Sequence, residues 1–336
     1  MNPTPDHAVL SRAQGALLGQ LAGDSLGSLV EFQGPEAIRA RYPDGVRDLA
    51  DGGTWQTLAG QPTDDSELAL ALARTLVGAG SYRADAAARA YAGWYRSRPF
   101  DIGNATRRAL GAAAAALARG EDPETAARAA ADPQTQANGA LMRVSPLGIF
   151  GWRHPSALVA GWARSDAALT HPHVVCQDAS ALFAAAVAHA VAEGPTAASL
   201  YDFIADWADL LTPEVRQVVA AASDQRPPSY LEHAGWVLVA LQNALYQLLH
   251  ADSLEEGVVD TVMAGGDTDT NACIAGALLG ACHGLEAVPE RWREAVLACR
   301  PQEGLPGVRN PRPPEFWPID ALELAARLVG LGTQGG

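Results

Sequence analysis

Two short clusters of carboxylate and hydroxyl side chains are the residues of this sequence best suited to chemistry. One is Gly265-Gly266-Asp267-Thr268-Asp269-Thr270, and the other, about 200 residues upstream, is Thr63-Asp64-Asp65-Ser66. Each cluster precedes a long apolar run. Carboxylate and hydroxyl oxygens at this density suit hard cations such as Mg²⁺ and Mn²⁺, which prefer near-octahedral shells of oxygen. We expect the two clusters to meet in space and to hold metal ions.

The spacing within the later cluster restricts the backbone around it. On a continuous helix Asp267 and Asp269 would point about 200° apart, so both can face one ion only from a loop or from the first turn of a helix. The preceding Gly pair supplies the necessary freedom. Because a helix N-terminus repels a cation, several carboxylates must converge, and these two with Asp64 and Asp65 would suffice for two adjacent ions.

Three other interpretations of the clusters compete with a metal site, and the sequence excludes the first two. An EF-hand loop starting at Asp267 requires Gly at its sixth position and Glu at its twelfth, where Ala272 and Leu278 stand. A phosphatase-type D-x-D nucleophile follows an apolar strand, and residues 263–266 make a poor strand. Simple capping of a helix explains residues 63–66 taken alone, since Asp and Ser satisfy free N–H groups at a helix start.

The elements that must position the clusters are predicted to be helices. Apolar periodicity and Gly, Pro or capping residues at the ends predict them at 11–30, 63–76, 83–98, 105–119, 124–131, 155–169, 174–193, 197–210, 213–223, 233–250, 254–263, 271–282 and 319–330. Two of these segments carry glycines at four-residue intervals, namely Gly15, Gly19, Gly23, Gly27 and Gly276, Gly280, Gly284. Each interior Gly costs about 1 kcal/mol relative to Ala, so we expect close approach of a neighbouring helix or a ligand.

The composition is that of a protein with a large core. Hydrophobic residues make up 48% of the 336 residues, charged residues 18% and aromatic residues 6%, which excludes disorder and favours closely packed helices. No segment alternates apolar and polar residues as a strand does, and no sequence repeat is present. We therefore predict an all-α fold. Since the candidate ligands stand near both ends of residues 24–270, we also predict a single compact multi-helix bundle and one domain over 1–336.

Charge and targeting signals argue against several classes of partner. The net charge of −14 disfavours nucleic acid, whose binders show a basic face. Residues 1–7 lack the features of a signal peptide, and the apolar run 181–192 is shorter than the ~20 residues that cross a bilayer. The cysteines Cys176, Cys273, Cys282 and Cys299 lack the spacing of a zinc site, and we expect them to be reduced thiols. We expect a cytoplasmic monomer without membrane contact.

Six motifs between about residues 13 and 285 resemble one known family in their order and spacing. They are Gly15–Glu31, Thr63–Ser66, Asp101–Gly103, Asn138–Arg143, Leu169–His171 and Gly265–Thr270. Together they resemble the ADP-ribosylglycohydrolase family, which includes the bacterial dinitrogenase-reductase-activating glycohydrolases and the eukaryotic ADP-ribosylarginine and ADP-ribosylserine hydrolases. Any one motif is weak alone, and it is the six in sequence that carry the resemblance.

The resemblance implies an all-α bundle with a binuclear Mg²⁺ or Mn²⁺ centre in a central cleft. It implies metal ligands at Thr63, Asp64, Asp65, Asp267, Asp269 and Thr270. It implies catalytic roles for Glu31, Asp65 and Asp267. The implied contacts to ADP-ribose or its acceptor are Asp101, Asn104, Asn138, Gly139, His171 and, as a stacking aromatic residue, Trp236.

The function implied is hydrolysis of the bond between ADP-ribose and a modified group. Metal ions would polarise a water and orient the ribose, and Glu31 or one of the Asp groups would act as acid or base. Asp101 favours an arginine acceptor, because a carboxylate pairs bidentately with a guanidinium. Serine-linked ADP-ribose, a free ADP-ribose metabolite and a non-catalytic ADP-ribose-binding role remain alternatives, the last disfavoured by the intact acidic clusters.

Overall fold

The computed structural model describes residues 6–332, and helices account for its regular structure. In that range two isolated β-bridges, Gly52 with Thr57 and Ala137 with Trp236, are the only strand-like pairings. The α-helices are α1 (His7–Gly27), α2 (Pro35–Arg41), α3 (Asp64–Ala79), α4 (Ala84–Arg96), α5 (Asn104–Ala118), α6 (Pro123–Ala130), α7 (Ser145–Phe150), α8 (Ser156–Ala167), α9 (Val174–Glu193), α10 (Ala197–Ala208), α11 (Pro213–Ala221), α12 (Val237–His250), α13 (Leu254–Met263), α14 (Thr268–His283), α15 (Glu290–Ala298) and α16 (Ala321–Leu331). The all-α prediction is confirmed.

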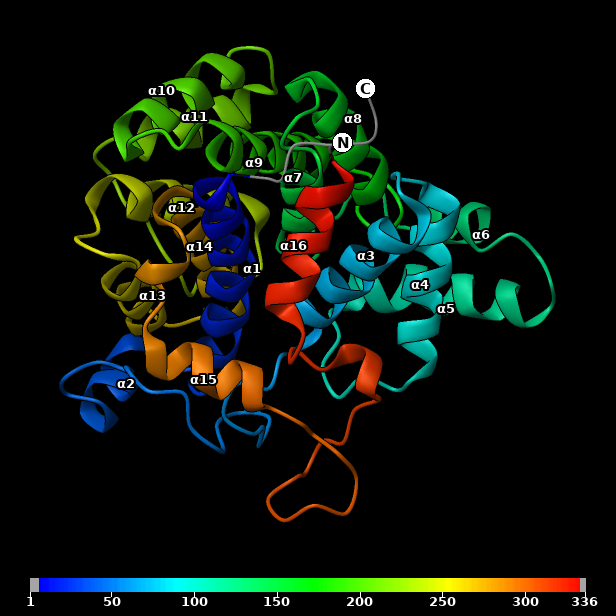
Figure 1. Cartoon of the computed structure of the whole chain (residues 1–336), viewed down its shortest axis with the longest axis horizontal. Coiled ribbons are helices and arrows are strands. Elements are labelled where there is room, and N and C mark those ends of the chain that lie inside the picture. The colour runs from blue at the N-terminus through cyan, green and yellow to red at the C-terminus, as the bar shows by residue number, and fades with distance from the viewer. Residues whose placement is uncertain (1–5, 333–336) are drawn as a thin grey trace.

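Helices α1 and α14 form the centre of the bundle and run antiparallel, side by side (Figure 1). Their glycine stripes face each other. A Cβ placed on Gly19 would lie 2.2 Å from the carbonyl oxygen of Gly276, and one on Gly23 would lie 2.2 Å from that of Ala272. No real Cβ fits at such distances, so the glycines are required by the close approach of the two backbones. The prediction of a neighbouring helix is confirmed.

The other helices surround this central pair. Helices α12 and α13 pack on α14, while α16 and α3 lie on the other side of α1, with α4–α6 outside them (Figure 1). Helix α9 is long and apolar enough to cross a membrane, a longer apolar segment than the sequence suggested, because Asp178 and Glu193 are its only charged residues. Since 83% of its most apolar 18-residue stretch is buried inside the protein, α9 serves here as a core helix.

Several predicted boundaries were wrong for local reasons. Helix α1 begins at His7 and not at residue 11, because the Asp6 side chain accepts the Ala8 N–H and caps an earlier turn. Helix α14 begins at Thr268 and not at residue 271, whereas the helix of residues 233–250, expected to start near Gly235-Trp236, does begin at Val237 with Trp236 as its N-cap. The short helices α2 and α15 were not predicted. Part of the segment 1–7, in which no signal peptide is predicted, lies outside the described residues.

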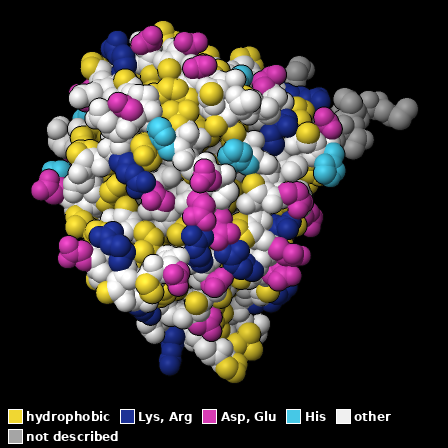
Figure 2. Space-filling view, turned by 90° about the vertical axis from the view of Figure 1, so that its left-hand side faces the viewer, with side chains coloured by type: hydrophobic (Ala, Val, Ile, Leu, Met, Phe, Trp, Pro, Cys, Tyr) yellow, Lys and Arg dark blue, Asp and Glu magenta, His cyan; other side chains and the backbone are white. Residues whose placement is uncertain are grey.

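The described surface and thiols agree with a globular helical protein. On the face seen in Figure 2, Asp and Glu side chains lie among Arg side chains, and that face shows no broad basic patch. The four cysteines are free. Cys176, Cys273 and Cys299 are buried, and burial raises the pKa of each thiol. The reduced state of these thiols stays a prediction from the sequence.

Candidate active site

Both acidic clusters stand at the first turns of long helices. Asp64 and Asp65 open α3, and Asp267 precedes α14 as its N-cap residue. The chain reaches α14 through Gly265 and Gly266, each with a φ of 79°. A Cβ on Gly266 would lie 1.9 Å from a backbone carbonyl oxygen of the neighbouring loop, so only glycine fits there. Of the two backbone states expected there, a loop or the first turn of a helix, the structure has the first turn, because α14 begins at Thr268 and not at residue 271 as predicted.

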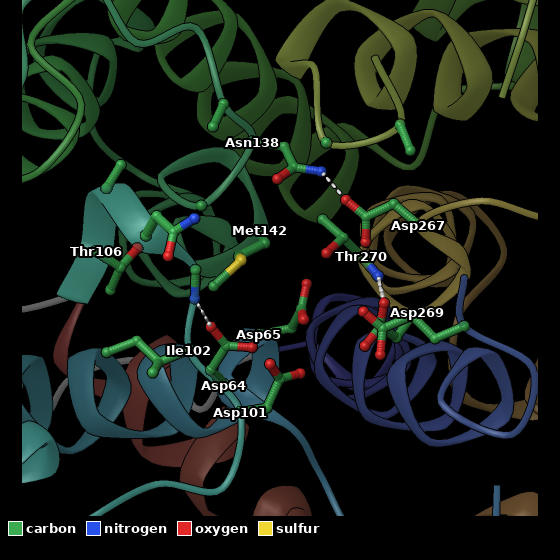
Figure 3. Close-up of a pocket in the computed structure, with 18 of the residues that line it drawn as sticks. Asp64, Asp65, Asp101, Ile102, Thr106, Asn138, Met142, Asp267, Asp269 and Thr270 are labelled. Carbon is green, nitrogen blue, oxygen red and sulfur yellow. Dashed lines mark hydrogen bonds between the residues drawn. The ribbon is translucent and has the colours of Figure 1, made fainter. Parts of the chain in front are cut away.

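The two clusters meet at a cavity of about 450 Å³. Figure 3 shows Asp64, Asp65 and Asp101 gathered on one side and Asp267 and Asp269 on the other, with their carboxylates directed toward the space between them. With Glu31, six carboxylates line the cavity, and no Arg does. Acidic groups converge here without a protein cation among the lining residues.

Each side of the cavity is held by hydrogen bonds that leave carboxylate oxygens free. The Asn138 side-chain amide donates to Asp267 Oδ2 at 2.7 Å, and the Gly103 N–H donates to Asp64 Oδ2 at 3.4 Å (Figure 3). The Thr270 N–H donates to Asp269 Oδ1 at 2.9 Å. The remaining oxygens face a space lined by like charges.

The donor set fits divalent cations. Asp65 Oδ1 is buried and has no hydrogen-bond partner among the described residues, an arrangement that costs free energy unless something binds that oxygen. Glu31, Asp101 and Asp269 place carboxylate oxygens within 4.8 Å of one another. Carboxylate and hydroxyl oxygens without sulfur or imidazole among them suit Mg²⁺ or Mn²⁺ better than zinc.

The pKa values of the cavity carboxylates also indicate a cation site. Burial, followed by the charges of neighbouring carboxylates, raises the pKa of Glu31 to about 8, that of Asp64 to about 7 and that of Asp101 to about 9. The same causes raise the pKa values of Asp65 and Asp269. Such a cluster holds its full negative charge at neutral pH only when cations offset the repulsion.

A separate residue caps the helix that carries the first cluster. Asp24, fully buried near the end of α1, accepts the backbone N–H groups of Thr63 at 3.1 Å and of Ser66 at 3.1 Å, and the Thr63 hydroxyl at 2.9 Å. Thr63 itself makes no side-chain cap bond. Because Asp24 supplies the cap, the side chains of Asp64 and Asp65 do not bond to the helix N-terminus. The capping interpretation of residues 63–66 is therefore wrong for Asp64 and Asp65.

A polar wall without net charge, formed by Asn138, Gly139 and His171, lies next to the acidic groups. His171 is buried, and burial together with the Arg143 charge lowers its pKa to about 3, so its ring is neutral. Arg143 donates to the Thr170 hydroxyl oxygen at 2.9 Å, which leaves the hydroxyl hydrogen for His171 Nδ1 at 2.7 Å. The tautomer with its ring proton on Nε2 is the one that lets Nδ1 accept this hydrogen, which has no other acceptor among the described residues. A Cβ on Gly139 would lie 2.9 Å from the His171 ring, so glycine is required beside it.

Most of the predicted site residues line the cavity: Glu31, Asp64, Asp65, Asp101, Asn104, Asn138, Gly139, His171, Asp267, Asp269 and Thr270. Thr63 is not among the lining residues, but its hydroxyl lies 2.9 Å from Asp24 Oδ1 and 3.1 Å from Oδ2 of the cavity-lining Asp65. Trp236 does not line it. Its ring lies in an adjoining hollow of about 570 Å³ with His233, and its indole N–H donates to Gln136 at 3.0 Å.

Three residues contribute to the site without having been assigned a role from the sequence. They are Asp24, Trp55, whose indole N–H donates to Glu31 Oε2 at 2.5 Å, and Arg143, which orders His171. The sequence signals were present but weak: a carboxylate inside a glycine-rich apolar helix, a Trp in a loop of Asp, Gly and Thr, and an Arg in an apolar stretch.

Comparison with known proteins decides the family. Residues 5–328 match the family model described as ADP-ribosylglycohydrolase. The chain belongs to the ADP-ribosylglycohydrolase family. It is similar to a solved structure titled "ADP-ribosylglycohydrolase-related protein complex", with a TM-score of 0.77 and 29% identity over 96% of this chain and 99% of the other.

Curated relatives carry related names. The chain is 31% identical to the ADP-ribosylarginine hydrolase Tri1 of Pseudomonas putida (strain GB-1), over 95% of this chain and 83% of the relative. It is also 31% identical to the ADP-ribosyl-[dinitrogen reductase] glycohydrolase of Rhodospirillum rubrum, over 85% and 90%. The human ADP-ribosylhydrolase ARH3 is 26% identical over 85% and 89%. Family and relatives together support a hydrolase that acts on ADP-ribosyl groups.

Proposed function

We propose that this chain is a Mg²⁺- or Mn²⁺-dependent hydrolase that releases ADP-ribose from arginine side chains of modified proteins. The observation that carries the proposal is the convergence of six carboxylates on one cavity, five of them buried and Asp101 partly exposed, with no Arg among the lining residues to neutralise them. Thr63, Asp64, Asp65, Asp267, Asp269 and Thr270 would hold two cations. When bound, the cations would supply a polarised water of lowered pKa and anchoring points for ribose hydroxyls.

Asp101 would determine the acceptor. It lies outside both clusters, at the turn before α5, and its carboxylate is within 4.8 Å of Glu31 and Asp269. A guanidinium placed against Asp101 would gain two charge-assisted hydrogen bonds and would bring its glycosidic nitrogen beside the other carboxylates. A serine acceptor offers no such pair of donors. The name of the Pseudomonas putida relative, an ADP-ribosylarginine hydrolase, supports the same acceptor.

Glu31 would exchange the proton of the reaction. Its Oε2 accepts the Trp55 indole N–H, which leaves Oε1 to take a proton from the attacking water or to return one to the leaving nitrogen. A positioned acid or base of this kind contributes about 10²–10⁴-fold to a rate. Burial and neighbouring carboxylates raise the pKa of Glu31 to about 8 in the absence of cations, so its protonation responds to what binds nearby.

The ADP-ribose diphosphate and ribose would lie along the polar wall. His171 offers an Nε2–H donor there, beside Gly139 and Asn138. The first residues of α5, Asn104 and Ala105, also line the cavity, and α5 has no side-chain cap on its first N–H groups. Free N–H groups at a helix N-terminus favour phosphate oxygens.

The test is release of ADP-ribose from arginine-linked and serine-linked peptides, each with Mg²⁺, with Mn²⁺ and with EDTA. We expect release from the arginine peptide that EDTA abolishes. Asp269→Asn should abolish it as well, whereas Asp206→Asn, the same change at an exposed carboxylate of α10, should not. No release under any condition overturns the enzymatic proposal. Release from the serine peptide alone overturns the arginine assignment, and EDTA-resistant release overturns metal dependence.

A further inference from the structure

The loop between α2 and α3 carries one aromatic side chain, Trp55, into the cavity. Trp55 lines the cavity and donates its indole N–H to Glu31 Oε2 at 2.5 Å. The ring also lies 6.2 Å, centroid to centroid, from that of Phe100, the residue before Asp101. Trp55 therefore contacts Glu31 directly and borders the segment that carries Asp101.

The surroundings of Glu31 explain why such a donor matters. Two like-charged neighbours, Asp101 and Asp269, have carboxylate oxygens within 4.8 Å of it. Like charges at this distance repel and would drive Glu31 toward other side-chain rotamers. The indole N–H is a neutral donor that holds one oxygen in place without adding positive charge, and hydrogen bonds to a charged acceptor are the stronger kind.

Backbone contacts also bind the Trp55 loop to Glu31. The Thr54 hydroxyl donates to the Glu31 carbonyl oxygen at 2.9 Å, and the Thr54 N–H donates to the Ser28 carbonyl oxygen at 3.1 Å. Gly52 and Thr57 close the loop with a pair of backbone hydrogen bonds of 2.8 and 2.9 Å. The loop is thus a closed turn packed on the end of α1.

The C-terminal segment before α16 anchors the same loop from outside. The Asn310 side-chain amide donates to the Trp55 carbonyl oxygen at 2.5 Å, and the Gln61 amide donates to the Asn310 carbonyl oxygen at 2.8 Å. Two residues further on, Arg312 forms a buried ion pair with Glu67 of α3 at 2.8 Å. The segment therefore fixes the Trp55 loop and the helix of the first acidic cluster together.

We infer that Trp55 is a positioning residue that holds the Glu31 carboxylate at the acidic cavity, and that Asn310 holds Trp55. The inference rests on the proposed function, in which Glu31 exchanges the proton. Trp55 acts through Glu31, so its removal should affect the chemical step more than substrate binding. Asn310 acts one step further away, so its removal should have the same kind of effect with a smaller size.

The decisive variant is Trp55→Phe, which keeps an aromatic ring and removes the N–H. We expect kcat to fall about 10- to 100-fold, as for the loss of one hydrogen bond to a charged group, with KM changed less than about threefold. Asn310→Ala should lower kcat less. Trp152→Phe removes an indole N–H bond to the Val329 carbonyl oxygen, away from the cavity-lining residues, and serves as the matched control with unchanged kcat.

A double-mutant cycle separates positioning from general damage. In a Glu31→Gln background, Trp55→Phe should have less than about a twofold further effect on kcat, and the midpoint of thermal unfolding should match that of Trp152→Phe. The same cycle is then measured for Mn²⁺ affinity, by calorimetry without substrate. Trp55→Phe and Glu31→Gln should each weaken Mn²⁺ binding by a similar factor, and the double variant should bind no more weakly than either single variant. Independent, multiplying effects in both cycles overturn the role of Trp55.

The outcomes distinguish this inference from the proposed function. A wild-type chain that neither binds Mn²⁺ nor releases ADP-ribose overturns the proposed function, and the inference falls with it. A wild-type chain with either property, in which Trp55→Phe behaves like Trp152→Phe, overturns only the inference.

Discussion

The glycine stripe of α1 offers the sharpest test of how the fold positions the acidic groups. In the variant Gly27→Ala the new Cβ would lie 2.3 Å from the Thr268 carbonyl oxygen and 2.4 Å from Asp269 Cα. Gly15→Ala makes the same chemical change at the other end of the stripe, 2.5 Å from the Gly280 carbonyl oxygen. The two sites are about 18 Å apart along the helix.

The magnitude follows from these distances. An ordinary Cβ contact is about 3.4 Å or longer, so either variant must separate α1 and α14 locally by about 1 Å. Overpacking of this kind costs about 1–3 kcal/mol, from which the helix propensity of Ala recovers up to about 1 kcal/mol. At Gly27 the displaced atoms belong to Asp269, and a shift of about 1 Å in an active site costs about 10²-fold in rate.

We therefore expect similar losses of stability but unequal losses of function. Urea unfolding should show both variants destabilised by about 1–2 kcal/mol. Calorimetric Mn²⁺ binding and ADP-ribose release should fall steeply for Gly27→Ala and little for Gly15→Ala. Gly93→Ala in α4, where a new Cβ meets no atom within 4 Å, is the control and should be neutral or stabilising. A Gly27→Ala variant with wild-type stability and Mn²⁺ affinity would refute the close-approach reasoning, as would greater loss of binding at Gly15.

Three further predictions concern buried charge and the polar wall. Arg312→Met should destabilise the protein by about 3–5 kcal/mol in urea, because Glu67, only 1% exposed, would lose its charged partner; an unchanged midpoint would contradict this. Since burial lowers the pKa of His171 to about 3, the unfolded chain binds a proton at His171 that the native state lacks below pH 6.5, so the contribution of His171 to stability should fall as the pH drops from 6.5 toward 3. The cavity carboxylates, whose pKa values are raised, contribute with the opposite sign, so the quantity to measure is the free energy of unfolding of wild type relative to His171→Asn, which should fall over this range; a constant difference would show that His171 has no such effect. Thr170→Val should raise KM about fivefold by releasing the His171 ring, and Thr170→Ser should restore it, whereas equal KM values in both variants would argue against the tautomer assignment.

The features that sequence alone predicted well are local ones. The two-residue spacing of Asp267 and Asp269 and the two glycines before them restricted the backbone to a loop or a first helical turn, and the structure has the first turn of α14. The glycine stripe likewise implies a close neighbour, because four interior glycines in one helix are costly without one. The family motifs then indicated which distant segments meet.

The features that were missed depend on contacts between distant parts of the chain. Trp55 reaches Glu31 across 24 residues, and Asn310 reaches Trp55 across 255. Neither pairing leaves a periodicity or a spacing that a sequence pattern would reveal. The early start of α1 at His7, with Asp6 as its N-cap, was missed for a different reason, since two alternative capping residues, Asp6 and Ser11, stand at the start of the same apolar run. Local preference does not decide between them.

Asp24 resolves a conflict that any cation site at a helix N-terminus must face. The positive end of α3 favours carboxylates as caps, and a carboxylate that caps has fewer oxygens for a metal. In this fold a carboxylate from α1 supplies the cap through the Thr63 and Ser66 N–H groups. Asp24 adds negative charge behind the helix start, which offsets the repulsion of that end toward cations. Asp64 and Asp65 can therefore face the cavity, and they do so because α1 lies close enough to α14 for both clusters to meet.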